Sequence, residues 1–355
     1  MPRRDNRSDA ELRVVVIGSS GHSQFSLTNF ILCREEFARE VSSSAASCKN
    51  LGQLAGQRLA LVNGPNLYEE DLSKAKMKEE LWRVKCLSAP GPHAFLLAFD
   101  LDRISPNDVK TPKLVAQHFG QKSLDYCMVL LAYEGNEDIT RLHERVMRID
   151  LHMAELLEHC GFRYHIVYTK RQLASHERRG QERELLRKVE RMLSMQGGHH
   201  YTSQDYQRAE ESVRKEERRL QKKRQPETER AWAEFQTQYK GEELRWKMDS
   251  YNASVRAELR VKAEMDNGLL RKTLAWGVGV GVLLGAVMGM VIGSVEGPGG
   301  LAVGGTMGAA MGGATGGAVQ VAIKHLEERV GPRPGNFDPV FINRFFRAPR
   351  FSIRR

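Results

Sequence analysis

Residues 12–200 alternate short apolar runs with segments long enough to form helices. The runs are nearly continuous in apolar residues, which is typical of strands buried on both faces of a parallel sheet. The pattern therefore predicts an α/β domain, a parallel sheet covered by helices. The predicted strands are residues 12–18, 59–64, 94–99, 127–133 and 164–169.

Residues 201–272 are highly charged and are predicted to form a charged helical extension. Glutamates lie four residues before basic residues, a spacing that stabilises exposed helices. Pro226 predicts a break in this helix. After the break, apolar residues recur at helical spacing, which favours a helix packed on a neighbour; a coiled-coil dimer is the alternative. The stripe consists of Leu244, Met248, Tyr251, Val255 and Leu259.

Residues 274–323 form two uncharged arms around the turn sequence "EGPGG". The first arm, 274–295, is long enough to cross a bilayer core. A glycine at every fourth position costs helix propensity in water but allows close backbone packing inside a membrane. The two glycine rows are Gly277, Gly281, Gly285, Gly289 and Gly293, and Gly300, Gly304, Gly308, Gly312 and Gly316.

The charges around these arms predict a membrane-inserted hairpin with both ends on the cytoplasmic side. Arg271 and Lys272 precede the first arm, Lys324 follows the second, and Glu296 lies in the turn. A buried hairpin in a soluble protein is the alternative. The tail, 324–355, mixes arginines with phenylalanines and is either a disordered basic tail or a segment lying on anionic headgroups.

The composition adds two constraints. The formal net charge of +10 favours acidic partners such as an anionic membrane surface or nucleic acid. The five cysteines are scattered and odd in number, which indicates buried thiols of a reducing compartment. Residues 1–11 are polar and basic, so we expect a flexible N-terminus without a secretory signal.

The sequence "VVVIGSSGHSQFS" (14–26) resembles a strand that leads into a phosphate-binding loop. In such a loop, glycines turn backbone N–H groups toward the phosphates, a lysine bridges the outer phosphates, and a Ser or Thr hydroxyl holds magnesium. Here the closing Gly-Lys-Ser is replaced by Ser23, Gln24 and Phe25. A purely structural turn is therefore the alternative to a weak anion site, in which backbone amides and His22 would act as donors.

Three longer segments resemble the GTPase of immunity-associated proteins (GIMAP) family, which has an AIG-type G domain. They are "LSAPGPHAFLLAFDLDRISPND" (87–108), "HFGQKSLDYCMVLL" (118–131) and "ELLEHCGFRYHIVY" (155–168). The resemblance covers residues 12–200. It implies a Ras-like P-loop NTPase fold, GTP or GDP with magnesium as ligands in active members, assembly through the nucleotide faces, and a C-terminal membrane anchor in several members.

Aligned with this family, the chain departs at each nucleotide motif. The first-switch threonine falls near Ala45, and the magnesium-linked aspartate falls on Asn63. These losses argue against hydrolysis and against magnesium binding, and they weaken guanine specificity. The resemblance places possible nucleotide contacts at Gly18, Ser19, Ser20, Gly21, His22, Ser23, Gln24, Phe25, Asn136, Tyr168 and Thr169.

Together these features predict a membrane-tethered GIMAP-like protein on the cytoplasmic face of an intracellular membrane. It would bind GTP or GDP weakly or not at all, have no catalytic or metal-binding residues, and act as a scaffold. Its predicted partners are the membrane and copies of itself or other GIMAP-type G domains, but not nucleic acid. The alternative is a GTP-binding switch GTPase with a rewritten phosphate loop.

Three smaller features are interpreted structurally. His199 and His200 lack a third metal ligand at a convincing spacing. Cys160 and His165 lie in a helix-to-strand connection by resemblance, so a nucleophile pair is not favoured. The basic helix 218–224 lacks interleaved aromatic residues, which favours a solvated or partner-binding face over nucleic-acid binding.

Overall fold

The computed structural model describes residues 11–18, 21–32, 47–68, 73–147, 151–169 and 175–273, with only the backbone at Gly21, His22 and Thr273. The chain divides into two compact units, Met1–Glu211 and Ser212–Arg355. In the first unit the elements are β1 (Leu12–Gly18), α1 (Gly21–Ile31), β2 (Cys48–Leu54), β3 (Gln57–Asn63), α2 (Lys74–Leu87), β4 (Ala94–Asp100), α3 (Pro106–Phe119), the 3-10 helix η2 (Gln121–Tyr126), β5 (Cys127–Tyr133), α4 (Ile139–Met147), α5 (Leu151–His159), β6 (Tyr164–Tyr168) and α6 (Ser175–Met195). Then follow α7 (Gln204–Gln238), which continues from the first unit into the second, α8 (Gly241–Met265) and α9 (Gly268–Thr273).

The first unit is built on a six-stranded sheet with the order β2-β3-β1-β4-β5-β6. Every neighbouring pair is parallel except β2 and β3, which pair antiparallel from Cys48 opposite Asn63 to Leu54 opposite Gln57. This is the strand order of Ras-like P-loop G domains, so the predicted fold class is confirmed. The central strand β1 pairs with β3 on one side and β4 on the other, and this position fixes where the loop after β1 emerges.

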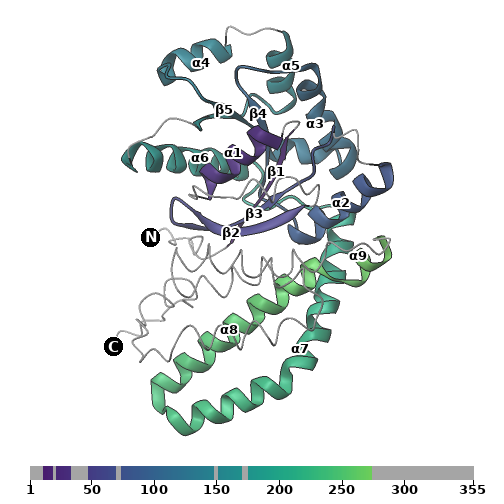
Figure 1. Ribbon diagram of the computed structural model, residues 1–355, viewed down its shortest axis with the longest axis vertical. Coiled ribbons are helices and arrows are strands. Elements are labelled where there is room, and N and C mark those ends of the chain that lie inside the picture. The colour runs from purple at the N-terminus through teal and green to yellow at the C-terminus, as the bar shows by residue number, and fades with distance from the viewer. Residues whose placement is uncertain are drawn as a thin grey trace, which may run out of the picture. The chain divides into compact units, whose positions relative to one another are not determined.

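Helices cover both faces of this sheet. On one face α1 and α6 lie together (Figure 1), and side chains of both helices join the alternate residues of β1 in one buried cluster. On the other face Phe95 of β4 packs against Phe119 of α3, with ring centroids 5.0 Å apart. Burial on both faces explains why the strands appear in the sequence as unbroken apolar runs. The cluster under α1 and α6 includes Val14, Val16, Leu27, Phe30, Leu185 and Val189.

The five predicted strands are confirmed as β1, β3, β4, β5 and β6, with ends shifted by no more than two residues. The sequence prediction missed β2. Its sequence "CKNLGQL" contains Lys49, Asn50 and Gln53, so it has no continuous apolar run. It forms because β3 offers it a partner through the two-residue turn at Ala55 and Gly56, both of which have positive φ.

The segment after α6 packs against the end of the sheet at which the parallel strands begin. Tyr201 donates its hydroxyl to the Phe119 carbonyl and packs edge-on against Phe95, with ring centroids 5.7 Å apart. Tyr206, in the first turn of α7, is fully buried with its hydroxyl 3.1 Å from Ser88 Oγ. The first compact unit therefore includes the start of α7 and extends beyond residue 200.

In the second unit the stripe on α8 packs against α7. Phe235 of α7 contacts Tyr251 of α8, with ring centroids 5.6 Å apart, and Trp232 Nε1 donates to Asn252 Oδ1 at 3.1 Å. The interpretation of the stripe as one helix packed on a neighbour is therefore confirmed within this chain. Val255 and Leu259 are buried in the same stripe.

The predicted helix break at Pro226 is wrong, since α7 runs continuously from Gln204 to Gln238. Proline inside a helix loses one hydrogen bond and costs about 3 kcal/mol. Contacts with α8 support the helix on both sides of it. Arg224 lies 3.7 Å from Glu258, and Trp232 bonds Asn252, so packing on α8 overrides the local preference.

The short helix α9 is fastened to α7. Asn267 Oδ1 accepts from the Leu270 N–H at 3.2 Å and from Ser212 Oγ at 2.9 Å. Arg271 bonds Asp266 at 2.7 Å and Glu216 at 2.9 Å, and these two carboxylates raise its pKa above the ordinary arginine value. The last described turn is therefore held at a defined place on α7.

Among residues 11–18, 21–32, 47–68, 73–147, 151–169 and 175–273, no helix is both long and apolar enough to cross a membrane. The predicted hairpin of residues 274–323 and the tail of residues 324–355 lie outside the described residues. The membrane prediction therefore stays a prediction.

We expect the buried ion pair between Lys85 and Asp205 to stabilise the first unit. The Lys85 side chain is 6% exposed, and its Nζ lies 2.6 Å from Asp205 Oδ2 and 4.8 Å from the Trp82 ring centroid. Asp205→Ala would leave a buried cation without its carboxylate. Because Asp205 itself is 37% exposed, solvent softens the effect, and we expect a loss of about 1–3 kcal/mol in the free energy of unfolding.

Urea denaturation of the two variants Asp205→Ala and Asp102→Ala measures this difference. Asp102 pairs with Arg145 at the surface, where both side chains are at least 40% exposed. We expect its removal to cost less than about 1 kcal/mol. Equal losses in the two variants would contradict a special role for the buried pair.

Candidate functional site

The candidate site lies at the carboxyl edge of the sheet, where β1 ends at Gly18 and α1 begins at Gly21. A Cβ atom on Gly18 would come within 3.0 Å of the Ala98 carbonyl oxygen of β4 and 3.2 Å of Gln24 Oε1. Only glycine lets β1 and β4 and the Gln24 side chain approach this closely. The strand, the glycine and the helix start of a phosphate loop are therefore present.

Gln24, at the lysine position of such a loop, is turned into the protein. Its side chain is buried, with the residue 7% exposed. Its Nε2 donates to the main-chain oxygens of Val16 at 3.2 Å and Gly64 at 2.9 Å. Both N–H groups of the amide thus bind the ends of β1 and of the segment after β3. Neither is left for a phosphate, and the side chain carries no charge.

Asn63, at the position of the magnesium-linked aspartate, is also bound within the protein. Thr28, one turn after Gln24 on α1, shares its hydroxyl proton between the Gln24 carbonyl oxygen and Asn63 Oδ1, at 2.8 Å each. A neutral amide engaged in this way lacks the charge that magnesium prefers in its ligands. With Phe25 at the position of the Ser or Thr ligand, the described side chains do not fit a magnesium ion.

The remaining predicted loop residues differ in what the structure describes. Ser19, Ser20 and Ala45 lie outside the described residues, and Gly21 and His22 are described by their backbone as the first residues of α1. Ser23 is buried and Phe25 is half-buried. Their proposed contacts with a nucleotide stay predictions.

Two tyrosines lie at the end of the site that is predicted to contact guanine. The rings of Tyr133 and Tyr168, at the ends of β5 and β6, contact each other edge-on with centroids 5.7 Å apart. Tyr168 donates its hydroxyl to the Glu137 carbonyl oxygen at 2.6 Å, and the Tyr133 hydroxyl accepts the Glu137 N–H at 3.3 Å. Thr169 donates its N–H to the Tyr133 carbonyl oxygen at 3.0 Å.

These contacts bring Tyr168 and Thr169 together with the loop after β5, whereas Asn136 of that loop is exposed. The Tyr133 hydroxyl fills the space beside Gly135, where a Cβ atom would meet it at 2.2 Å. The two tyrosine hydroxyls thus hold the loop by its own backbone.

A cavity of about 530 Å³ lies beside the edge strand β6. His165 and Gln181 line it, and His165 Nε2 and Gln181 Oε1 are buried without hydrogen-bond partners among the described atoms. Burial, and then the nearby charges of Lys188 and His143, lower the pKa of His165 to about 3. His165 is therefore a neutral, weak base, as the structural interpretation expects. It is the second residue of β6, whereas only Cys160 lies in the connection between α5 and β6, so the expected place of His165 is wrong.

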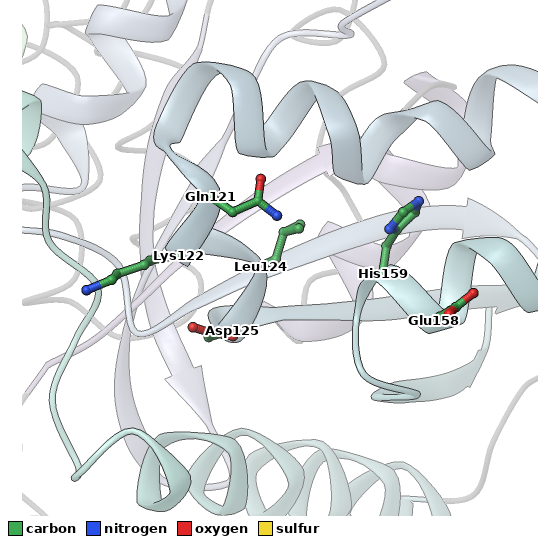
Figure 2. A pocket seen from close by; sticks show the side chains of 6 residues that line it. All are labelled: Gln121, Lys122, Leu124, Asp125, Glu158 and His159. Carbon is green, nitrogen blue, oxygen red and sulfur yellow. The ribbon is translucent and has the colours of Figure 1, made fainter.

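A second, more open cavity of about 500 Å³ lies between η2 and the end of α5, at the opposite edge of the sheet from Gly18. Figure 2 shows Lys122 and Asp125 on η2 and Glu158 and His159 at the end of α5. Charges of both signs are spread over its rim, and this arrangement does not select a ligand class.

The histidines at 199 and 200 lie in the connection between α6 and α7. Within the described ranges no cluster of three or more His, Cys, Asp or Glu side chains could hold a metal ion. His200 instead packs edge-on against His93, with ring centroids 5.7 Å apart. Burial is the main cause that lowers the pKa of His93 to about 3, and His93 Nδ1 accepts the Arg13 N–H at 2.9 Å.

Sequence reasoning found the altered positions but missed how they are bound. Thr28 was not singled out, although a threonine four residues after a helical residue commonly bonds back to that residue's carbonyl. The inward turn of Gln24 had no local signal, because its acceptors come from β1 and from residue 64, which lies 40 positions away.

Comparisons with known proteins agree with this fold. The model of the AIG1 family matches residues 12–223. The human protein GTPase IMAP family member 8 is 27% identical over 199 residues, covering 55% of this chain and 28% of its own length. Immune-associated nucleotide-binding protein 9 of Arabidopsis thaliana is 24% identical over 218 residues, covering 58% of this chain and 62% of its own. The chain thus spans less than two thirds of either relative.

Among solved structures, Toc33 from Arabidopsis thaliana in complex with GDP and Mg2+ aligns with 52% of this chain and 85% of its own, at 12% identity and a TM-score of 0.40. That likeness is too distant to inform the site. The family match is much broader, since residues 12–223 make up more than half of the 355 residues. The chain therefore belongs to the AIG1 family, with a G domain of the GTPase type.

Proposed function

We propose that this protein is a membrane-tethered scaffold of the AIG1 family whose G domain does not hydrolyse GTP. The observation that carries the proposal is the position of Gln24. Its amide donates to Val16 and Gly64 instead of extending toward a phosphate. The domain would then act through the proteins it binds or through self-assembly rather than through turnover.

The charge balance of the site supports this proposal. A lysine and magnesium together neutralise the outer phosphates of a bound nucleotide, and a hydrogen bond to a charged group contributes about 1.5–3 kcal/mol. Gln24, Phe25 and Asn63 supply no charge. The backbone amides at the start of α1 favour an anion on their own, so a weak, magnesium-independent interaction with GTP or GDP is compatible with the proposal.

The names of the relatives favour a second candidate. The human relative is called a GTPase and the Arabidopsis relative a nucleotide-binding protein. If this chain shares that property, it is a GTP-binding switch with a rewritten loop. It would then need a replacement cation, for example one supplied by a second copy across the nucleotide face.

The membrane tether in this proposal rests on the sequence of residues 274–323. Two uncharged arms of bilayer length with basic residues at both outer ends favour a hairpin inserted from the cytoplasmic side of an intracellular membrane. The glycine rows favour contact between the arms or with another copy.

We predict that the full-length protein shows no magnesium-dependent heat of GTP or GDP binding in calorimetry and hydrolyses GTP at the background rate. Loss of even one preorganised charge stabiliser commonly raises a barrier by about 2.7–4 kcal/mol. The triple variant Ser23→Gly, Gln24→Lys, Phe25→Ser restores the closing Gly-Lys-Ser. We expect it to gain phosphate affinity.

Gln117→Lys is the matched control, because Gln117 is exposed on α3 and the substitution adds the same charge away from the loop. Circular dichroism of every variant checks that the fold is retained. Turnover by the wild type that disappears in Gln24→Ala would overturn the scaffold proposal and support the switch.

We also predict that replacing Gly281, Gly285 and Gly289 with leucine leaves membrane insertion intact but weakens hairpin closure or self-association. Leucine keeps each arm apolar, whereas its side chain blocks the close approach that glycine allows. Carbonate extraction measures insertion, and cross-linking measures association.

Two outcomes would contradict parts of this prediction. If carbonate releases the wild type as a soluble protein, the arms are not inserted and the tether fails. If the leucine variant cross-links as well as the wild type, insertion stands but the glycine rows are not the contact.

A further inference from the structure

Helix α7 carries a row of basic side chains that the described part of the chain leaves unneutralised. Lys215, Arg218 and Lys222 are exposed and recur at spacings of three and four residues, which places them on one face of the helix. Lys223 is exposed beside them. None of the four has an ion-pair partner among residues 175–273 or the other described ranges. We call these four residues the α7 basic face.

The acidic residues of the same stretch of α7 are all engaged elsewhere. Glu216 bonds Arg219 at 2.9 Å and Arg271 at 2.9 Å, and Glu217 lies 3.8 Å from Arg260 of α8. Between residues 212 and 226 no other acidic residue occurs. Glu211 lies one turn before Lys215, but the described structure records no ion pair between them, so the α7 basic face presents a net positive charge to its surroundings.

The contacts of Glu216 also engage Arg271, one of the two basic residues that precede the first uncharged arm. The sequence assigns Arg271 as a positive charge just before the first uncharged arm. In the structure its guanidinium is neutralised by Asp266 and Glu216, with Nε to Asp266 Oδ1 at 2.7 Å. The charge that would hold this end of the chain at an anionic surface must then come from other residues.

The α7 basic face begins beside the residue of α7 that holds α9, the last described helix. Arg271 is bonded to Glu216 of α7, and residue 274 follows three residues later, a reach of roughly 10 Å at most. Lys215 directly precedes Glu216 on α7. The α7 basic face points roughly 120° around the helix axis from Glu216. The row therefore begins on the turn of α7 to which Arg271, near the end of the last described helix, is bonded.

We propose that the α7 basic face binds the anionic headgroups of the bilayer in which residues 274–323 insert. The location of this contact rests on the proposed membrane tether. Anionic lipid suits the face because it offers a plane of negative charge to a row of exposed lysines and an arginine. Nucleic acid is the less suitable partner, because the row has no aromatic side chain among its members on which a base can stack.

Lysine reactivity tests the proposal with the full-length protein reconstituted in vesicles. Acetylation rates of Lys215, Lys222 and Lys223 are measured by mass spectrometry in phosphatidylcholine vesicles with and without phosphatidylserine. Lys240, exposed at the turn between α7 and α8, is the internal control. We expect phosphatidylserine to slow the three lysines several-fold and leave Lys240 unchanged. Salt at about 1 M, where the Debye length is about 3 Å, should abolish the protection.

Charge-reversal variants locate the contact. In the triple variant Lys215→Glu, Arg218→Glu, Lys222→Glu, phosphatidylserine should no longer slow the acetylation of Lys223. The matched control is Arg230→Glu, Lys240→Glu, Arg245→Glu, which changes the net charge equally at exposed residues of α7, α8 and the turn between them. It should keep the protection of Lys223.

Carbonate extraction and lysine acetylation together distinguish the lipid contact of the α7 basic face from the membrane tether. If the protein resists carbonate extraction but phosphatidylserine does not slow the lysines, the lipid contact is overturned and the tether stands. If carbonate extracts the protein but phosphatidylserine still protects the lysines, the contact stands and the tether fails. Equal protection by duplex DNA without vesicles would overturn lipid as the partner in favour of nucleic acid.

Discussion

The side-chain amide of Gln24 is the contact on which the candidate site depends. It joins the end of β1 to the segment after β3 by donating to Val16 and Gly64. A lysine in the same place would bring a charge that needs an anion, whereas a glutamine satisfies two main-chain oxygens without a ligand. The end of β1 and the segment after β3 are thus joined by the protein's own groups, with Thr28 and Asn63 extending the same network.

The loop after β5, at the predicted guanine-contacting end of the site, is also held by side chains of the protein itself. The hydroxyls of Tyr133 and Tyr168 bond to the backbone of Glu137 and hold the loop after β5. A loop tied by buried tyrosines does not need a bound base to order it. At both ends of the predicted nucleotide site, the described side chains are thus held by contacts within the protein.

The second unit distributes its charges unevenly. Arg224 with Glu258 and Arg260 with Glu217 join α7 to α8, and Arg271 with Glu216 joins α9 to α7. The α7 basic face is left out of these pairs. The ion pairs that fix α9 on α7 thus determine which cations remain for an external partner.

The sequence by itself determined the class of the first unit. Continuous apolar runs at β1, β3, β4, β5 and β6 reflect burial on both faces, a property each strand carries within its own residues. The polar strand β2 carries no such signal, because it is stabilised by its pairing with β3. The altered residues at positions 23–25 and 63 were equally visible in the sequence, since they concern residue type rather than geometry.

Only the tertiary structure decided where those side chains point and which charges are free. Gln24 finds its acceptors on β1 and at residue 64, Pro226 stays helical because α8 supports both sides of it, and Arg271 is neutralised by Glu216, 55 residues earlier in the chain. In each case the deciding partner is distant in sequence. Local propensity and charge describe a residue alone, whereas these outcomes depend on which groups the fold brings within hydrogen-bonding distance.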